Sequence, residues 1–453
     1  MRLAKLLLAL PIVALALTDA QDASACGGCF ITQGESTVVT GHRMILSVSA
    51  QETTLWDQIV YSGDPSSFAW VLPVNGLVEF GLSSDALFQN LEGLSQVYIS
   101  SPTIDCTPPS CPGSQNAPGG GVDDSEGSSG GGGGGEPPVV VVAQETVGPF
   151  EMVQLSSQSS GALQSWLTSH NYNIPAEIAP VISAYVSAGF NFLALKLVPG
   201  VGVGAMRPVR ITTPGAGATL PLRMVAAGTG VVTPITLWVL AEGRYEPQNF
   251  PSFEIQNEEL VWNWDEERSN YSDLKQTAFD ATDGAGWLVE AGEPLSAYNI
   301  EYPLVDLVQW NTAESGYDPV NDLEPAEQLA EDLEKLYGHI PEGSLWINRL
   351  HAELSRQALT DDLDLSASAD QVAVNRYFEA THTVGTAPEC PPNPPCDDGP
   401  DYSDVFGSPD EDIDLWGNGG SCAMERRGGA QAALGGLAVV AALGLIRRRR
   451  RAS

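Results

Sequence analysis

The sequence predicts an α+β protein built mainly on antiparallel β-sheet, with helices more frequent toward its C-terminal part. Two observations support this fold class. Short runs of β-branched and large apolar residues, separated by Gly and Pro turns, continue to about residue 255. Beyond that point, leucines recur at helical spacing among acidic residues. At 453 residues, the chain has room for about two or three ordinary domains.

The first part of the body, residues 26–112, is β-rich. Its strand candidates are residues 43–48, 55–61 and 68–74. The last of these is an almost wholly apolar run, as expected of a buried strand. Ser83 or Ser84 can cap a short helix that continues to Leu94.

The remainder of the body, residues 139–385, starts β-rich and then gains helices. Its strand candidates are residues 139–142, 190–198, 207–213, 220–227 and 231–240. Its helix candidates are residues 159–170, 175–189, 269–279, 324–337 and 348–359. In the 324–337 segment, Leu329, Leu333 and Leu336 lie on one predicted helix face.

Two low-complexity segments separate these parts. Residues 113–138 contain an unbroken glycine run and predict a disordered insertion. Residues 386–421 predict an acidic stalk rich in Pro and Gly. Aspartates alternate at 410, 412 and 414 as in a calcium loop, but the sharp-turn glycine is missing. A solvated stalk is therefore the favoured interpretation, and no metal site is predicted.

The charge balance excludes nucleic-acid binding. The chain carries 57 acidic against 21 basic residues, a formal net charge of −36. Such a surface repels phosphate backbones.

The N-terminus, residues 1–25, predicts a secretory signal peptide. Arg2 and Lys5 precede an apolar stretch, and Ala23-Ser24-Ala25 is a small-residue site for signal peptidase. Cys26 follows this site directly, so lipidation of Cys26 is an alternative outcome of processing. We expect export from the cytoplasm in either case.

The C-terminus, residues 422–453, predicts a membrane-associated sorting tail. Residues 428–446 form an apolar span of 19 residues, followed by five arginines at 447–451 that favour a cytoplasmic end. With Cys422 and the preceding glycines, residues 417–453 resemble the myxobacterial-type C-terminal sorting tail (MYXO-CTERM). The resemblance implies removal by a sorting protease and surface anchoring through Cys422. The alternative is a permanent anchor in the inner membrane, facing the periplasm.

Six of the seven cysteines form three close pairs. These pairs are Cys26 with Cys29, Cys106 with Cys111, and Cys390 with Cys396. In an exported chain, such spacing favours local disulfides, although their connectivity stays open. A redox role for Cys26 and Cys29 is less favoured because no helix is predicted directly after them. A zinc site is less favoured because no second pair of ligands has a compatible spacing. Cys422 is the cysteine without an obvious partner.

Several motifs together resemble the domain of unknown function 2330 family. They are Cys26-Gly-Gly, residues 59–74 (IVYSGDPSSFAWVLPV), Asp85-Ala-Leu-Phe88, residues 206–211, 220–224 and 345–351, and residues 361–365. The resemblance covers about residues 24–370. It implies an exported bacterial envelope protein and supplies no catalytic residues.

The sequence identifies no catalytic or cofactor site. The five histidines, His42, His170, His339, His351 and His382, share no metal-ligand motif. Arg207, Arg210 and Arg223 lie on neighbouring predicted strands and could form an anion pocket. The favoured alternative is that they pair with the many surrounding carboxylates.

Two functions from different classes remain. The first is a surface structural or binding module of unknown ligand, with no cofactor. The second is an extracellular hydrolase with a catalytic carboxylate pair, which would require two buried carboxylates about 5–10 Å apart in an open cleft.

Overall fold

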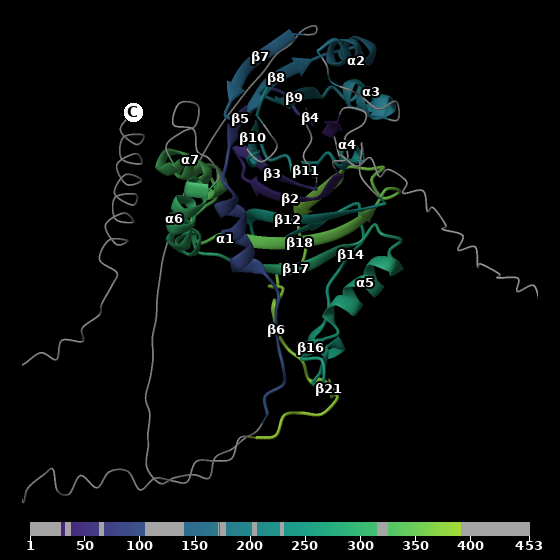
Figure 1. Cartoon of the computed structure of the whole chain (residues 1–453), viewed down its shortest axis with the longest axis vertical. Coiled ribbons are helices and arrows are strands. Elements are labelled where there is room, and N and C mark those ends of the chain that lie inside the picture. The colour runs from purple at the N-terminus through teal and green to yellow at the C-terminus, as the bar shows by residue number, and fades with distance from the viewer. Residues whose placement is uncertain are drawn as a thin grey trace, which may run out of the picture.

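The computed structural model describes most of the body of the protein (Figure 1). The described residues are 29–31, 38–62, 68–104, 140–170, 172, 178–201, 206–226, 231–314 and 325–390. The predicted signal peptide, glycine-rich insertion and sorting tail lie outside them, as does most of the predicted stalk. None of the described helices is long and apolar enough to cross a lipid bilayer.

The larger of two main sheets has eight strands, mostly antiparallel. Its strands are, in spatial order, β14 (Ser252–Phe253), β17 (Trp287–Pro294), β18 (Leu345–Ser355), β12 (Val232–Glu242), β2 (Val38–Val48), β3 (Glu52–Ser62), β10 (Val209–Pro214) and β5 (Glu79–Leu82). β12 and β2 run parallel at its centre, and β14 runs parallel to β17.

The second main sheet has five strands, all antiparallel. Its order is β1 (Cys29–Ile31), β4 (Phe68–Val74), β9 (Asn191–Leu197), β8 (Phe150–Ser156) and β7 (Val140–Val147). The apolar run at residues 68–74 is indeed a buried strand near the middle of this sheet.

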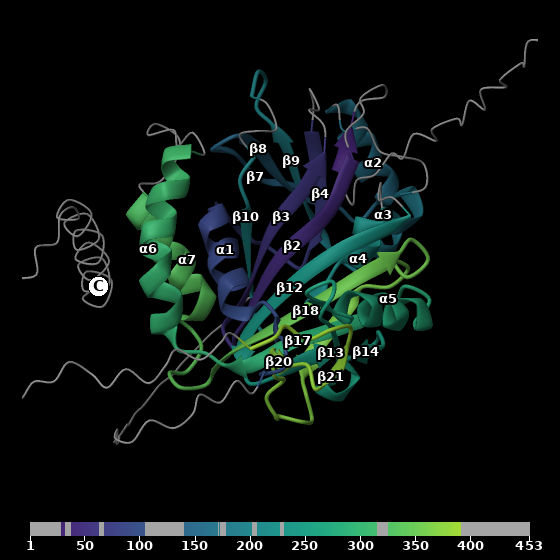
Figure 2. The ribbon, with the colours of Figure 1, turned by 60° about the horizontal axis from the view of Figure 1, so that its bottom comes forward.

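Helices cover the outer faces of both sheets, giving four layers (Figures 1 and 2). α1 (Asp85–Ser95), α6 (Ala297–Glu314) and α7 (Pro325–Tyr337) pack on the eight-stranded sheet. α2 (Ser160–Ser169) and α3 (Ala179–Ser187) pack on the five-stranded sheet. The strand alternation explains the layers, because Leu46 faces the other sheet while its neighbour Ile45 faces the helices.

Smaller elements complete the body. They are β6 (Tyr98–Ser100), β11 (Thr219–Leu220), α4 (Leu222–Val225), β13 (Tyr245–Pro247), a 3₁₀ turn at Asn257–Glu259, β15 (Val261–Asn263), β16 (Arg268–Ser269), α5 (Tyr271–Ala281), β19 (Leu363–Ala367), β20 (Tyr377–Glu379) and β21 (His382–Val384). β11 and α4 are the elements that matter for the site, because they lie beside the space between the two main sheets.

The α+β class and the mainly antiparallel pairing are confirmed, whereas two element predictions are wrong. Residues 348–359 were expected to be helical, but they fall largely in strand β18, which is paired on both sides by β12 and β17. Tertiary pairing overrides local helix propensity there. Residues 220–227 were expected to be a strand, but after Leu220 the chain turns into the short helix α4.

Candidate functional site

A histidine and an aspartate form a buried pair between the two main sheets. His42 Nδ1 lies 3.1 Å from Asp57 Oδ1, and their side chains are 0% and 2% exposed. His42 lies on β2 and Asp57 on β3, where they occupy diagonal positions on the same sheet face. Both face the inter-sheet core rather than solvent. Burying such polar groups costs free energy unless they are hydrogen-bonded, so the partners of each nitrogen and oxygen matter.

A β-bulge directly precedes His42. The β2–β3 register shifts between Val39 and Gly41, and regular pairing resumes at Gly41 opposite Val60, which places His42 opposite Ile59. Gly41 allows close approach of β12, because a Cβ there would lie 2.9 Å from the Pro234 carbonyl oxygen. Bulges of this kind redirect side chains, often next to functional sites.

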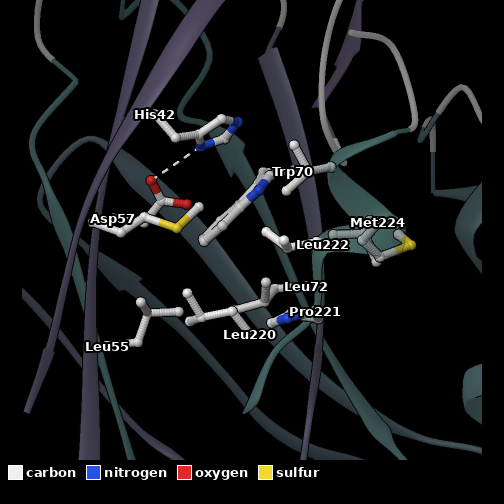
Figure 3. A pocket seen from close by; sticks show the side chains of 12 residues that line it. His42, Leu55, Asp57, Trp70, Leu72, Leu220, Pro221, Leu222 and Met224 are labelled. Atoms are coloured by element: carbon white, nitrogen blue, oxygen red, sulfur yellow. Dashed lines mark hydrogen bonds and ion pairs between the residues drawn. The ribbon is translucent and has the colours of Figure 1, made fainter. Parts of the chain in front are cut away.

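A small pocket adjoins the pair (Figure 3). It is lined by His42, Met44, Leu55, Asp57, Trp70, Val71, Leu72, Leu220, Pro221, Leu222, Met224 and Val225. Figure 3 shows the His42–Asp57 pair on one side and the Leu220–Met224 segment across from it. The enclosed space admits about one water molecule. Apart from His42, Asp57 and the Trp70 indole nitrogen, the lining side chains are apolar.

His42 Nε2 is buried and has no hydrogen-bond partner. It lies on the edge of the ring turned away from Asp57 (Figure 3). A carboxylate only accepts hydrogen bonds, so Nδ1 is the donor when it pairs with ionised Asp57, and in a neutral ring with that tautomer Nε2 keeps its lone pair. One residue of this otherwise largely apolar lining therefore carries a buried nitrogen without a partner.

Two further described segments fix the pocket wall formed by β11 and α4. Arg223 donates from Nη2 and Nε to Asp362 Oδ2, at 2.6 and 3.1 Å. The Arg223 guanidinium also lies 4.4 Å from the centre of the Tyr185 ring, and the Tyr185 hydroxyl donates to Asp362. We call Arg223, Asp362 and Tyr185 the wall clamp. It ties α4 to α3 and to the chain just before β19.

The three arginines singled out from the sequence are not gathered around one space. Arg210 contacts Asp332 at 2.9 Å and Glu331 at 2.6 Å on α7. Arg207 donates to Gln328, also on α7, and to the Ser83 carbonyl. Arg223 belongs to the wall clamp. The contacts to Asp332, Glu331 and Asp362 are those expected if these cations neutralise nearby carboxylates.

The buried carboxylates of the described residues each face a cation or a histidine. They are Asp57 beside His42, Asp332 beside Arg210, and Glu290 beside Arg349 and Lys275. Arg349 Nε lies 2.7 Å from Glu290 Oε2. Although burial alone would raise the pKa of Glu290, Arg349 and Lys275 together hold it below its usual value. This lowered pKa favours a permanently charged, structural Glu290 over a proton-exchanging acid.

Of the seven cysteines, the structure describes two, Cys29 and Cys390. Cys29 opens β1 opposite Trp70, and Cys390 is disulfide-bonded. Cys26, Cys106, Cys111, Cys396 and Cys422 lie outside the described residues. Among the described residues, no cluster of three His, Cys, Asp or Glu side chains could hold a metal ion.

The comparison with protein families gives one match. The model of a family of uncharacterized proteins conserved in bacteria, DUF2330, matches residues 20–307. The chain belongs to the DUF2330 family. The DUF2330 match includes the pocket and ends before α7 and β18, short of the 370 expected from the sequence motifs. No curated protein and no solved structure matches the chain.

His42 and Asp57 were not recognised as a pair from the sequence. His42 appeared as one of five isolated histidines, and Asp57 as one of 57 acidic residues. A usable signal was present, because both occupy inward positions of apolar strands, two residues from Met44 and Leu55 respectively.

Proposed function

We propose that this DUF2330 protein is an exported, envelope-anchored binding module. Export and anchoring are supported by the N-terminal signal-like segment and by the resemblance of residues 417–453 to a sorting tail. Signal peptidase and a C-terminal sorting protease are the processing partners that these segments imply.

The observation that carries the binding role is the unsatisfied His42 Nε2 beside the apolar pocket. A buried polar atom without a hydrogen-bond partner lowers the stability of the fold. We infer that such an atom is kept because it has a function. The described lining residues include no Ser, Thr, Cys or Lys that the pair could activate as a nucleophile. This lining supports binding over covalent catalysis.

The hydrolase alternative receives less support. A glycosidase-type pair needs two carboxylates facing one open cleft. Asp57, Glu290 and Asp332, the buried carboxylates of the described residues, instead each have a basic side chain as neighbour. These contacts give each carboxylate a structural role.

Anchoring is tested by fractionating the bacterium that makes the protein and measuring the intact mass of the mature chain. We expect wild type in the envelope fraction without residues 423–453, and Cys422→Ala retained with its tail or released from the surface. Ser421→Ala is the matched control and should behave as wild type. A mature wild-type chain that still contains residues 423–453 would replace sorting by a permanent membrane anchor.

Binding is tested separately with the purified full-length chain. A broad set of glycosides, esters and peptides should show no turnover, while small molecules that enter the pocket should raise Tm. Turnover that is lost on substituting a single carboxylate would overturn the binding role and favour the hydrolase.

A further inference from the structure

We infer that the inter-sheet pocket binds a small neutral molecule through a hydroxyl group that donates to His42 Nε2. This inference rests on the proposed binding function and names the ligand class. It follows from three properties of the pocket: the direction of the unsatisfied hydrogen bond, the charge beside it and the adaptability of its walls.

The first property is the acceptor. Seven buried side-chain nitrogen or oxygen atoms of the described residues lack a hydrogen-bond partner, and His42 Nε2 is the one whose residue lines this pocket. We take Nδ1, 3.1 Å from Asp57 Oδ1, as the donor of that hydrogen bond, and Nε2 of the neutral ring can then only accept. The ligand must therefore bring an O–H or N–H group, and an oxygen that only accepts would leave Nε2 unsatisfied.

The second property is charge. Asp57 is the charged residue among those that line the pocket, and the lining includes no Lys or Arg. A carboxylate or phosphate would approach Asp57 without a compensating cation, and a cation would be desolvated among Leu55, Leu72 and Leu222. A neutral ligand avoids both costs.

The third property is the adaptability of the walls. The pocket as it stands admits about one water molecule, so a larger ligand must move its lining. Met44 and Met224 face it, and methionine side chains repack readily around differently shaped groups. Leu222 and Met224 belong to α4, a helix of only four residues that the wall clamp ties to α3. A small apolar body attached to the hydroxyl can thus be accommodated against α4.

Phenol, anisole, toluene and benzoate test this class, because they share a ring and differ in the group presented to Nε2. Calorimetric titration of the full-length chain should rank phenol first, about tenfold tighter than anisole or toluene, the ratio expected for one ordinary hydrogen bond. Benzoate should bind most weakly. His42→Leu/Asp57→Val, which replaces the pair by apolar residues, should bind phenol and toluene equally. The exposed control His382→Leu should keep the wild-type ranking.

The outcomes separate the ligand class from the binding function. If anisole or benzoate binds as tightly as phenol and the double substitution abolishes that binding, the pocket is a site but the hydroxyl class is wrong. If none of the four binds, both the ligand class and the pocket-based binding function fail. Phenol binding that is unchanged in His42→Leu/Asp57→Val would place the ligand elsewhere and overturn the inference.

Discussion

Arg210 Nη1 lies 2.9 Å from Asp332 Oδ1, and this contact joins β10 of the eight-stranded sheet to helix α7. Both side chains are almost fully buried, at 4% and 3% exposure. Asp332 also accepts from Trp56 Nε1 at 2.9 Å and from Ser83 Oγ at 2.7 Å. Burial raises the pKa of Asp332, and the Arg210 guanidinium opposes that rise. The pair fixes α7 on the sheet.

Breaking this pair from one side should be costly. Arg210→Met leaves Asp332 buried without its cation, so we expect a loss of about 3–5 kcal/mol in the free energy of unfolding. Denaturant unfolding measures this loss. Lys196→Met is the control, because Lys196 and Glu151 are 36% and 34% exposed and such pairs contribute about 1 kcal/mol or less. Equal losses in the two variants would contradict the structural role of Arg210.

Replacing the whole His42–Asp57 pair should cost much less stability than removing one of its members. Replacing both residues in His42→Leu/Asp57→Val removes a buried polar pair and an unsatisfied nitrogen together, so we expect stability within about 1 kcal/mol of wild type, or higher. His42→Leu alone leaves Asp57 buried without a partner and should lose about 3–5 kcal/mol. Thermal unfolding of the three proteins checks this. A double variant no more stable than His42→Leu would mean that the pair is kept for folding.

Acid should destabilise the fold through His351. Burial lowers the pKa of His351 to about 4, Lys275 and Arg349 add to this effect, and Glu290 opposes it. Glu353 also lies near, at 3.9 Å from His351 Nε2. The unfolded chain takes up the proton near the ordinary value of 6.5, before the folded chain does. Stability from this residue is therefore complete above pH 6.5 and falls on acidification toward pH 4, by about 3 kcal/mol.

Unfolding of wild type and His351→Gln across this pH range measures the effect. The wild-type free energy of unfolding should fall more steeply with acid than that of the variant. His170→Gln, a substitution at an exposed histidine, should retain the wild-type slope. Parallel curves for wild type and His351→Gln would remove His351 as the cause.

The wall clamp should control access to the pocket. Arg223→Met removes the two guanidinium bonds to Asp362, so we expect a loss of about 1–3 kcal/mol and faster amide exchange at Met224 and Val225. Phenol should also enter faster. Arg268→Met is the control, since Arg268 is 57% exposed in its pair with Glu266. Unchanged exchange along α4 in Arg223→Met would show that packing alone holds the wall.

The strands at the centre of the fold could be predicted because their signal is local. Residues 68–74 form an apolar run, and residues 43–48 and 55–61 lie within β2 and β3. β18 was mistaken for a helix because residues buried on both sheet faces lose the alternation that marks a strand. α6 was missed because Pro303 lies inside it and interrupts the helical pattern.

The site was harder to predict than the fold because it is made by pairing across the chain. His42 and Asp57 are 15 residues apart and meet through the β2–β3 register, which depends on the bulge before His42. The opposite wall, β11 and α4, comes from residues 219–225 and was expected to be a strand. Neither the register nor this wall is encoded by a local motif.

The ligand class depends on His42 offering the lone pair of Nε2 to a ligand in the pocket. Nitrogen-15 NMR of the imidazoles in the full-length chain measures this, with His42→Leu to assign the signal. We expect His42 to carry its hydrogen on Nδ1 in the free protein and added phenol to shift the Nε2 resonance, while the His382 signals stay unchanged. A hydrogen on Nε2 in the free protein, or an Nε2 resonance that phenol does not shift, would rule out a hydroxyl ligand on His42.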